Sequence, residues 1–156
     1  MEMRVPMLDA HAVRAGACAL WNGAMWRRWT LGGALYERIV LRVSMINGCA
    51  VCFRMHKRSA TRFLGEEQLE AACKMEPLFD VPPSHRAALR YAALRTQRLP
   101  EEREAAVELA RFFDATERRA ITALVDLFTF NNRFNNTWEA ILPGARQRRR
   151  DMGMES

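Results

Sequence analysis

The chain has 156 residues, of which 49% are apolar, so it is the size of one domain and can bury a hydrophobic core without disulfide bonds. Its formal net charge is +6, but basic and acidic residues are mixed along most of its length, which argues against a dedicated nucleic-acid-binding domain. Four cysteines are too few for the disulfide framework of a secreted protein, and no apolar run approaches the ~18 residues of a membrane span. These features predict a cytoplasmic protein with neither a membrane nor a specific nucleic-acid partner.

Every long segment of the chain has helical rather than strand periodicity. Glycine and proline separate these segments, at Gly32-Gly33, at Asn47-Gly48 and at Pro100. The expected helices cover, in chain order, residues 8–29 (one helix, or two that separate at Gly23), 34–46, 49–64, 66–75, 84–97, 101–113 and 116 onward.

Two of these segments are apolar enough to lie inside a bundle. Residues 34–46 carry apolar side chains around most of the helix circumference, and the last helix directs Ile121, Leu124 and Leu127 inward. The predicted fold is therefore all-α, a bundle of about six to seven helices that forms one domain over residues 1–143. Residues 144–156 are a polar tail with a basic cluster at 146–150, which we expect to be disordered.

The strongest functional signal is a Cys-x-x-Cys pair with a histidine after it. Cys49, Cys52 and His56 stand at i, i+3 and i+7, which places them within about 60° of one another on one helical face. Arg54 and Lys57 fall on the opposite face, so the thiols are predicted to point inward. A helix N-terminus lowers the pKa of a thiol, the spacing permits a disulfide, and an imidazole one turn away can exchange a proton with Cys52. The pattern predicts a redox dithiol with its own base.

Glu37 is a candidate fourth member of this site. It lies on the apolar helix that precedes the Asn-Gly turn, where a carboxylate is costly unless it finds a partner, and burial would make it a usable proton carrier. The alternative is that Glu37 lies at the solvated start of its helix and has no role. The spacing alone does not choose between the two.

These four residues form the string E-x11-C-x2-C-x3-H, which closely resembles the core of alkylhydroperoxidase D-like (AhpD-like) proteins of the carboxymuconolactone decarboxylase superfamily. Residues 33–65 hold this core, and a looser similarity runs through 84–92 and 127–134. The resemblance implies an all-helical AhpD-like fold that assembles as a homo-oligomer, a trimer or a hexamer. It also implies a peroxidase that is itself reduced by a dithiol partner such as a lipoyl protein. Met45 stands at a position that is usually polar in the family, which favours an organic hydroperoxide as the substrate.

The resemblance also implies a role for each residue. Cys52 is the peroxidatic thiol, Cys49 is the resolving thiol, and Glu37 with His56 forms the proton relay, with no cofactor or metal beyond the redox-active Cys49–Cys52 disulfide. One departure is Val51, which replaces a second histidine that well-studied members carry just before the second cysteine.

Other interpretations stay open. The same residues could bind zinc, although no second ligand pair follows them, and the dithiol could instead exchange disulfides or be passive. Cys18 and Cys73 are interpreted as passive core thiols. Residues 131–136 are rich in asparagine and are expected to line an oligomer interface rather than a substrate cavity. Packing or interface positions are also expected for Trp21, Trp26, Trp29 and Trp138.

Overall fold

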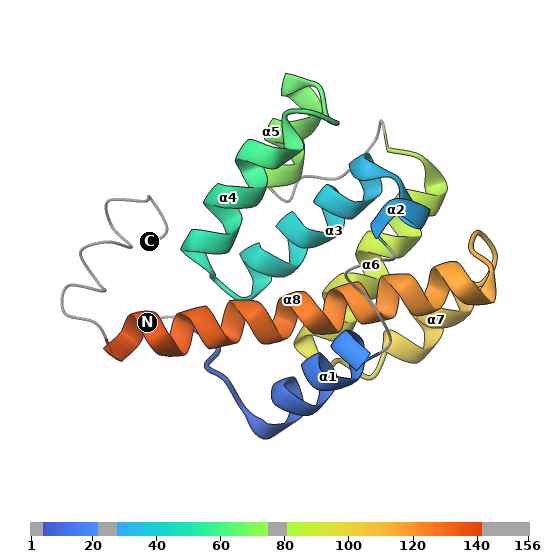
Figure 1. Ribbon diagram of the computed structural model, residues 1–156. Coiled ribbons are helices and arrows are strands. Elements are labelled where there is room, and N and C mark those ends of the chain that lie inside the picture. Colours follow the sequence, from blue (N-terminus) through green and yellow to red (C-terminus); the bar gives the residue numbers. More distant parts are fainter. Residues whose placement is uncertain (1–4, 22–27, 75–80, 142–156) are drawn as a thin grey trace.

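The computed structural model describes residues 5–21, 28–74 and 81–141, and every secondary-structure element in these ranges is a helix (Figure 1), which confirms the all-α class. The described ranges hold seven helices of eight or more residues, together with the single turn α2, which agrees with the predicted six to seven helices. The tail 144–156, Gly23 and Trp26 lie outside the described residues, as does the side chain of Trp29. The helices are α1 (Ala10–Trp21), α2 (Arg28–Leu31), α3 (Gly33–Ile46), α4 (Ala50–Ala60), α5 (Glu66–Lys74), α6 (Pro83–Gln97), α7 (Glu102–Leu109) and α8 (Ala115–Ile141).

Several helix ends differ from those predicted, because side chains and prolines cap the helices. α1 begins at Ala10 and not at Leu8, because Asp9 precedes it as a cap whose Oδ1 accepts a hydrogen bond from the Ala12 N–H at 2.8 Å. α4 ends at Ala60 instead of Leu64. The N–H groups of Phe63 and Leu64 both donate to the Ala60 carbonyl, which forms a turn after the helix. α6 begins with Pro83 in its first turn, where a proline is tolerated, so Ser84 does not cap it.

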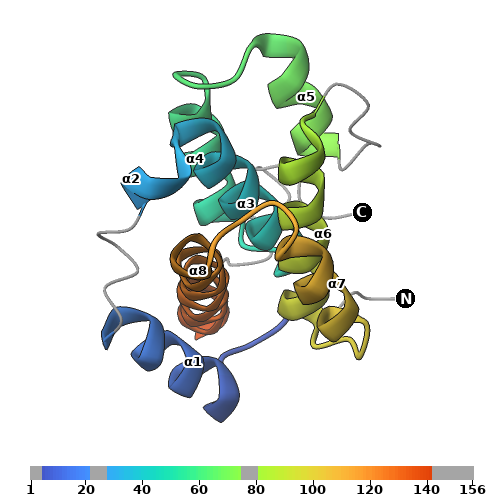
Figure 2. The same cartoon turned by 90° about the vertical axis from the view of Figure 1, so that its right-hand side faces the viewer.

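Helix α8 is the central element of the fold, with α1 on one side and α3 and α6 on the other (Figure 2). Its first half contributes Ile121, Leu124 and Val125 to the main hydrophobic core, which also contains buried residues of α3, α6 and α7. On the other side Gly16 of α1 lies against Phe130, where a Cβ atom would come within 2.5 Å of the ring. No helix in the described ranges is both long and apolar enough to span a membrane.

Candidate active site

The Asn47-Gly48 turn joins α3 to α4 and sets the position of the first thiol. Gly48 has φ of 62°, a conformation that favours glycine, and the Cys49 N–H then donates to the Ser44 carbonyl at 2.9 Å. Cys49 is therefore the N-cap of α4, not part of its first turn as predicted, and its Sγ accepts from the Cys52 N–H at 3.4 Å. The Cys-x-x-Cys spacing here serves as a helix cap as well as a dithiol.

Both thiols are buried and reduced, with 1% of Cys49 and 3% of Cys52 exposed. Hydrogen bonds from Cys49, Asn135 and Asn132 and the charge of His56 lower the pKa of Cys52 to about 6, although burial opposes the shift. The pKa of Cys49 is raised, because its thiol donates to Cys52, is buried and lies beside the Cys52 thiolate. The negative charge of the pair therefore resides on Cys52.

Glu37 lies in the second turn of α3 and is only 3% exposed, so the solvated alternative for this residue is wrong. Its Oε2 lies 2.9 Å from His56 Nδ1, and its Oε1 accepts from Ser59 Oγ at 2.7 Å. The ring of His56 packs edge-on against Phe128, with centroids 5.0 Å apart. Carboxylate and aromatic ring together fix the orientation of the imidazole. Ser59 was missed, because nothing in a lone serine on a helix signals a buried partner.

Helix α8 provides a polar contact that the sequence interpretation missed. Asn135 Nδ2 donates to Cys52 Sγ at 3.2 Å, and Asn132 bonds with Ser44 Oγ at 3.3 Å and Asn47 Nδ2 at 3.4 Å. The i, i+3 spacing of the two asparagines was the available signal, since it puts both amides on one face of α8.

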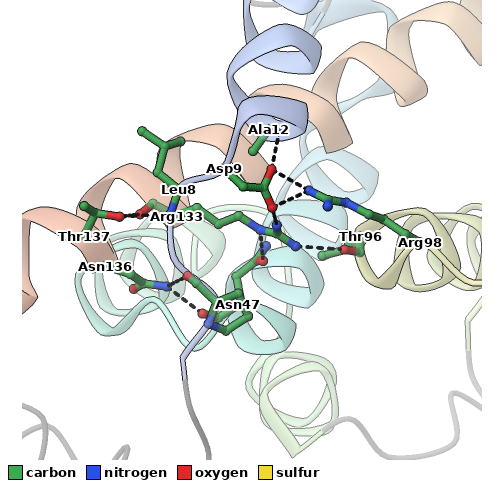
Figure 3. A network of polar contacts seen from close by, with 10 residues as sticks. Leu8, Asp9, Ala12, Asn47, Thr96, Arg98, Arg133, Asn136 and Thr137 are labelled. Carbon is green, nitrogen blue, oxygen red and sulfur yellow. Dashed lines mark hydrogen bonds and ion pairs between the residues drawn. The ribbon is translucent and has the colours of Figure 1, made fainter.

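Two further residues of the asparagine-rich segment, Arg133 and Asn136, bond to the α3–α4 turn and to residues that precede α1 (Figure 3). Asn136 Nδ2 donates to the carbonyls of Asn47, at 2.8 Å, and Pro6, at 3.0 Å. Arg133 donates to Asn47 Oδ1 at 3.2 Å and to Asp9 Oδ2 at 2.7 Å. The predicted role at an oligomer interface is therefore wrong for Asn132, Arg133 and Asn136, whose buried polar groups find their partners within the chain.

The other predicted positions lie apart from this arrangement. Cys18 is exposed on α1, so it is not a core thiol, whereas Cys73 is half-buried against the α3–α4–α5 cluster and burial raises its pKa. Val51 is 50% exposed, beside the buried Cys52. Trp21 and Trp138 are 91% and 61% exposed, which contradicts packing within the chain for these two tryptophans.

A metal site would need several ligands to converge. Within the described ranges, no three histidine, cysteine, aspartate or glutamate side chains form a group that could hold a metal ion. His56 Nδ1 instead contacts Glu37, and the Cys52 sulfur accepts from an amide. The zinc-binding alternative therefore finds no ligand set in this part of the chain.

Comparison with known proteins identifies a family for the chain. None of the curated proteins compared with the chain is significantly similar to it. The sequence model of the carboxymuconolactone decarboxylase family matches residues 12–93, which is slightly more than half of the chain and includes Glu37, both thiols and His56 but not α8. This match is consistent with the AhpD-like resemblance of the motif. The chain belongs to the carboxymuconolactone decarboxylase family.

Proposed function

We propose that the protein is a thiol-dependent peroxidase that reduces organic hydroperoxides through Cys52 and Cys49. The observation that carries this proposal is the geometry around Cys52, whose sulfur accepts a hydrogen bond from the Asn135 amide at 3.2 Å and lies beside a second thiol and one turn from the Glu37–His56 pair. The pKa of Cys52 is lowered to about 6, so this sulfur is a thiolate at neutral pH, while Cys49 keeps its proton. A thiolate is the nucleophile that peroxide reduction requires, and a neighbouring thiol can resolve the product.

The first step is attack of the Cys52 thiolate on the outer oxygen of the hydroperoxide. A sulfur–oxygen bond forms, the O–O bond breaks, and the alcohol leaves with a proton that the His56 imidazole can supply. Glu37 stabilises the imidazole and Ser59 holds the carboxylate in place. The peroxide is reduced by two electrons and Cys52 becomes a sulfenic acid.

The second step uses the thiol at the helix cap. Cys49 attacks the sulfur of the Cys52 sulfenic acid, the disulfide forms, and the hydroxyl group leaves as water with the proton of Cys49. An external dithiol, such as a dihydrolipoyl group, then reduces the disulfide and is itself oxidised. The pKa of Cys49 is raised chiefly by its hydrogen bond to the Cys52 thiolate, and that thiolate is gone once Cys52 is a sulfenic acid, so Cys49 can release its proton as it attacks.

The surroundings of Cys52 support a small apolar oxidant. Val51 and Met55, which flank Cys52 on α4, are 50% and 59% exposed and carry no charge. Cys52 itself is 3% exposed, which gives a hydroperoxide better access than a disulfide within another protein. Reduction of hydroperoxides is therefore favoured over general thiol–disulfide exchange. The exposed Phe134 and Trp138 on α8 support assembly into a homo-oligomer.

Rapid oxidation of the reduced protein tests the proposal. One equivalent of cumene hydroperoxide is added, free thiols are alkylated within seconds, and peptides are mapped by mass spectrometry. We expect a Cys49–Cys52 disulfide in the wild type and in Cys18→Ser, which removes an exposed thiol outside the site. Cys52→Ser should form no disulfide and consume no peroxide. Thiols that stay reduced in the wild type, or peroxide consumption that persists in Cys52→Ser, would refute the proposed peroxidase function.

A further inference from the structure

The Cys52 sulfur accepts a hydrogen bond from a helix other than α3 and α4, the two helices that the Asn47-Gly48 turn joins. Asn135 is on α8, 83 positions along the chain from Cys52, and its amide nitrogen lies 3.2 Å from Sγ. The side chain is partly buried, so water competes weakly for this contact. A donor that meets a buried sulfur stabilises the charged form of that sulfur over the neutral one.

The contacts around Asn135 fix its position along α8. The next residue, Asn136, donates to the Asn47 carbonyl, and Arg133 donates to the Asn47 side chain. Both contacts reach the turn that carries Cys49, so the same stretch of α8 positions the turn and the donor. The amide is therefore held in place before any substrate arrives, as an effective electrostatic group must be.

We propose that Asn135 is a catalytic residue of the Cys52 centre, where its amide holds the negative charge on sulfur in the resting thiolate. An amide neither gains nor loses a proton near neutral pH, so Asn135 stabilises charge while His56 and Glu37 move the proton. The inference rests on the proposed function for its role in peroxide reduction, but its effect on thiol acidity does not depend on that function.

The groups that bear on this sulfur come from each element around it. Cys49 precedes α4 and donates to the thiolate, His56 lies one turn further along α4, and Asn132 and Asn135 approach from α8. Glu37 of α3 acts through its contact with His56. A change at Asn135 alone leaves Cys49 and His56 in place, so the acidity of Cys52 can be assigned to the amide.

The test is the pH dependence of Cys52 alkylation by iodoacetamide, with the modified residue identified by mass spectrometry. Asn135→Leu removes the donor at similar volume, and Asn135→Asp keeps the shape but places a carboxylate against sulfur. We expect the pKa of Cys52 to rise by about one unit in the leucine variant and further in the aspartate variant. Alkylation at pH 6 should then fall about fivefold in Asn135→Leu, and reach the wild-type rate above pH 9.

The matched control is Asn131→Leu, one turn earlier on the same helix, which should leave the alkylation profile unchanged. A wild-type profile in both position-135 variants overturns the proposal, even if the wild type reduces peroxide. An equal shift in Asn135→Leu and Asn135→Asp also overturns it, because general loosening of the site would not distinguish a carboxylate from an alkyl group. If the shifts appear but the wild type consumes no peroxide, the amide role stands and the peroxidase proposal fails.

Discussion

The two halves of α8 make different kinds of contact with the rest of the chain. The first half buries Ile121, Leu124 and Val125 in the main core with α3, α6 and α7. The second half buries Asn132 and Asn136 at 0% and 1% exposure, and these amides bond to the α3–α4 turn and to the start of the chain. Apart from polar contacts of Thr122 with Tyr91 and of Asp126 with Arg95, the first half is held by non-directional apolar contacts, whereas the buried amides of the second half make directional hydrogen bonds.

The difference explains where precision is needed. Apolar side chains tolerate small rearrangements, whereas a hydrogen bond fails after a shift of less than an ångström. The thiols and their donors lie only at the polar half. We infer that the apolar half mainly supplies stability and the polar half mainly sets the geometry of the dithiol, and the following predictions test that separation.

The largest expected effect on stability comes from Leu124→Ala in the apolar half. Leu124 is 2% exposed, and truncation of a buried leucine typically lowers the free energy of unfolding by about 2–5 kcal/mol. Urea denaturation measures this loss, and iodoacetamide alkylation of the folded variant should give an unchanged pKa for Cys52. A shifted Cys52 pKa in this variant would break the proposed separation.

Arg133→Met should affect both stability and the site. The variant removes the Arg133 donor to the buried Asn47 Oδ1 and one of several donors to Asp9, which we expect to lower the free energy of unfolding by about 2 kcal/mol. It should also change the alkylation profile of Cys52, because the turn before Cys49 loses a contact. The control is Arg90→Met, which removes solvent-exposed ion pairs with Glu104 and Glu108 and should leave the profile as it is. An unchanged thiol profile in Arg133→Met would contradict the geometric role of the polar half.

Gly48→Ala is expected to have a smaller effect on stability. The φ of 62° puts an alanine in the left-handed region, which costs about 1–2 kcal/mol. Chemical denaturation gives the loss, and the rate of Cys49–Cys52 disulfide formation reports the position of the turn. Gly65→Ala is the matched control, because its Cβ would meet no atom within 4 Å. Equal stability of the two variants would show that the turn does not require a glycine.

The smallest expected effect is a pH dependence that comes from Asp9. The Arg98 guanidinium, with further donors, lowers the pKa of Asp9 from 3.8 to about 2. Because the folded pKa is depressed, the carboxylate stabilises the fold fully above about pH 4, and this contribution is lost as the pH falls toward 2. Urea midpoints at pH 6 and pH 3 should therefore differ less in Asp9→Asn than in the wild type. The effect is small, since the Asp9 side chain is 40% exposed. An identical pH dependence in both proteins would argue against this contact.

Much of the fold was predictable, because the helical period is a local property. The pattern predicted the breaks near Gly33 and Gly48, the inward face of the last helix and the burial of Cys49 and Cys52, all of which are confirmed. Helix ends were less predictable, since caps such as Asp9 and Cys49 depend on where a side chain finds a backbone N–H.

The site was predictable in part. The sequence motif correctly grouped four residues that lie together in the structure: Glu37, Cys49, Cys52 and His56. Three of them are close in sequence, and Glu37 is on the adjoining helix. Ser59 and Asn135 were missed, and Asn132 and Asn136 were expected at an interface. The reason is that asparagine on a helix looks the same whether its partner is a subunit, a ligand or another helix.

The sequence by itself determined that the chain is helical, that two thiols share one inward face and that a histidine follows them, because 3.6 residues per turn place side chains without reference to the rest of the fold. The tertiary structure decided the partners. Contact between Asn135 and Cys52 depends on the position of α8 along the α3–α4 hairpin, and that position is fixed only when Asn136 and Arg133 bond to Asn47. Those contacts join residues more than 80 positions apart, so no local period can encode them.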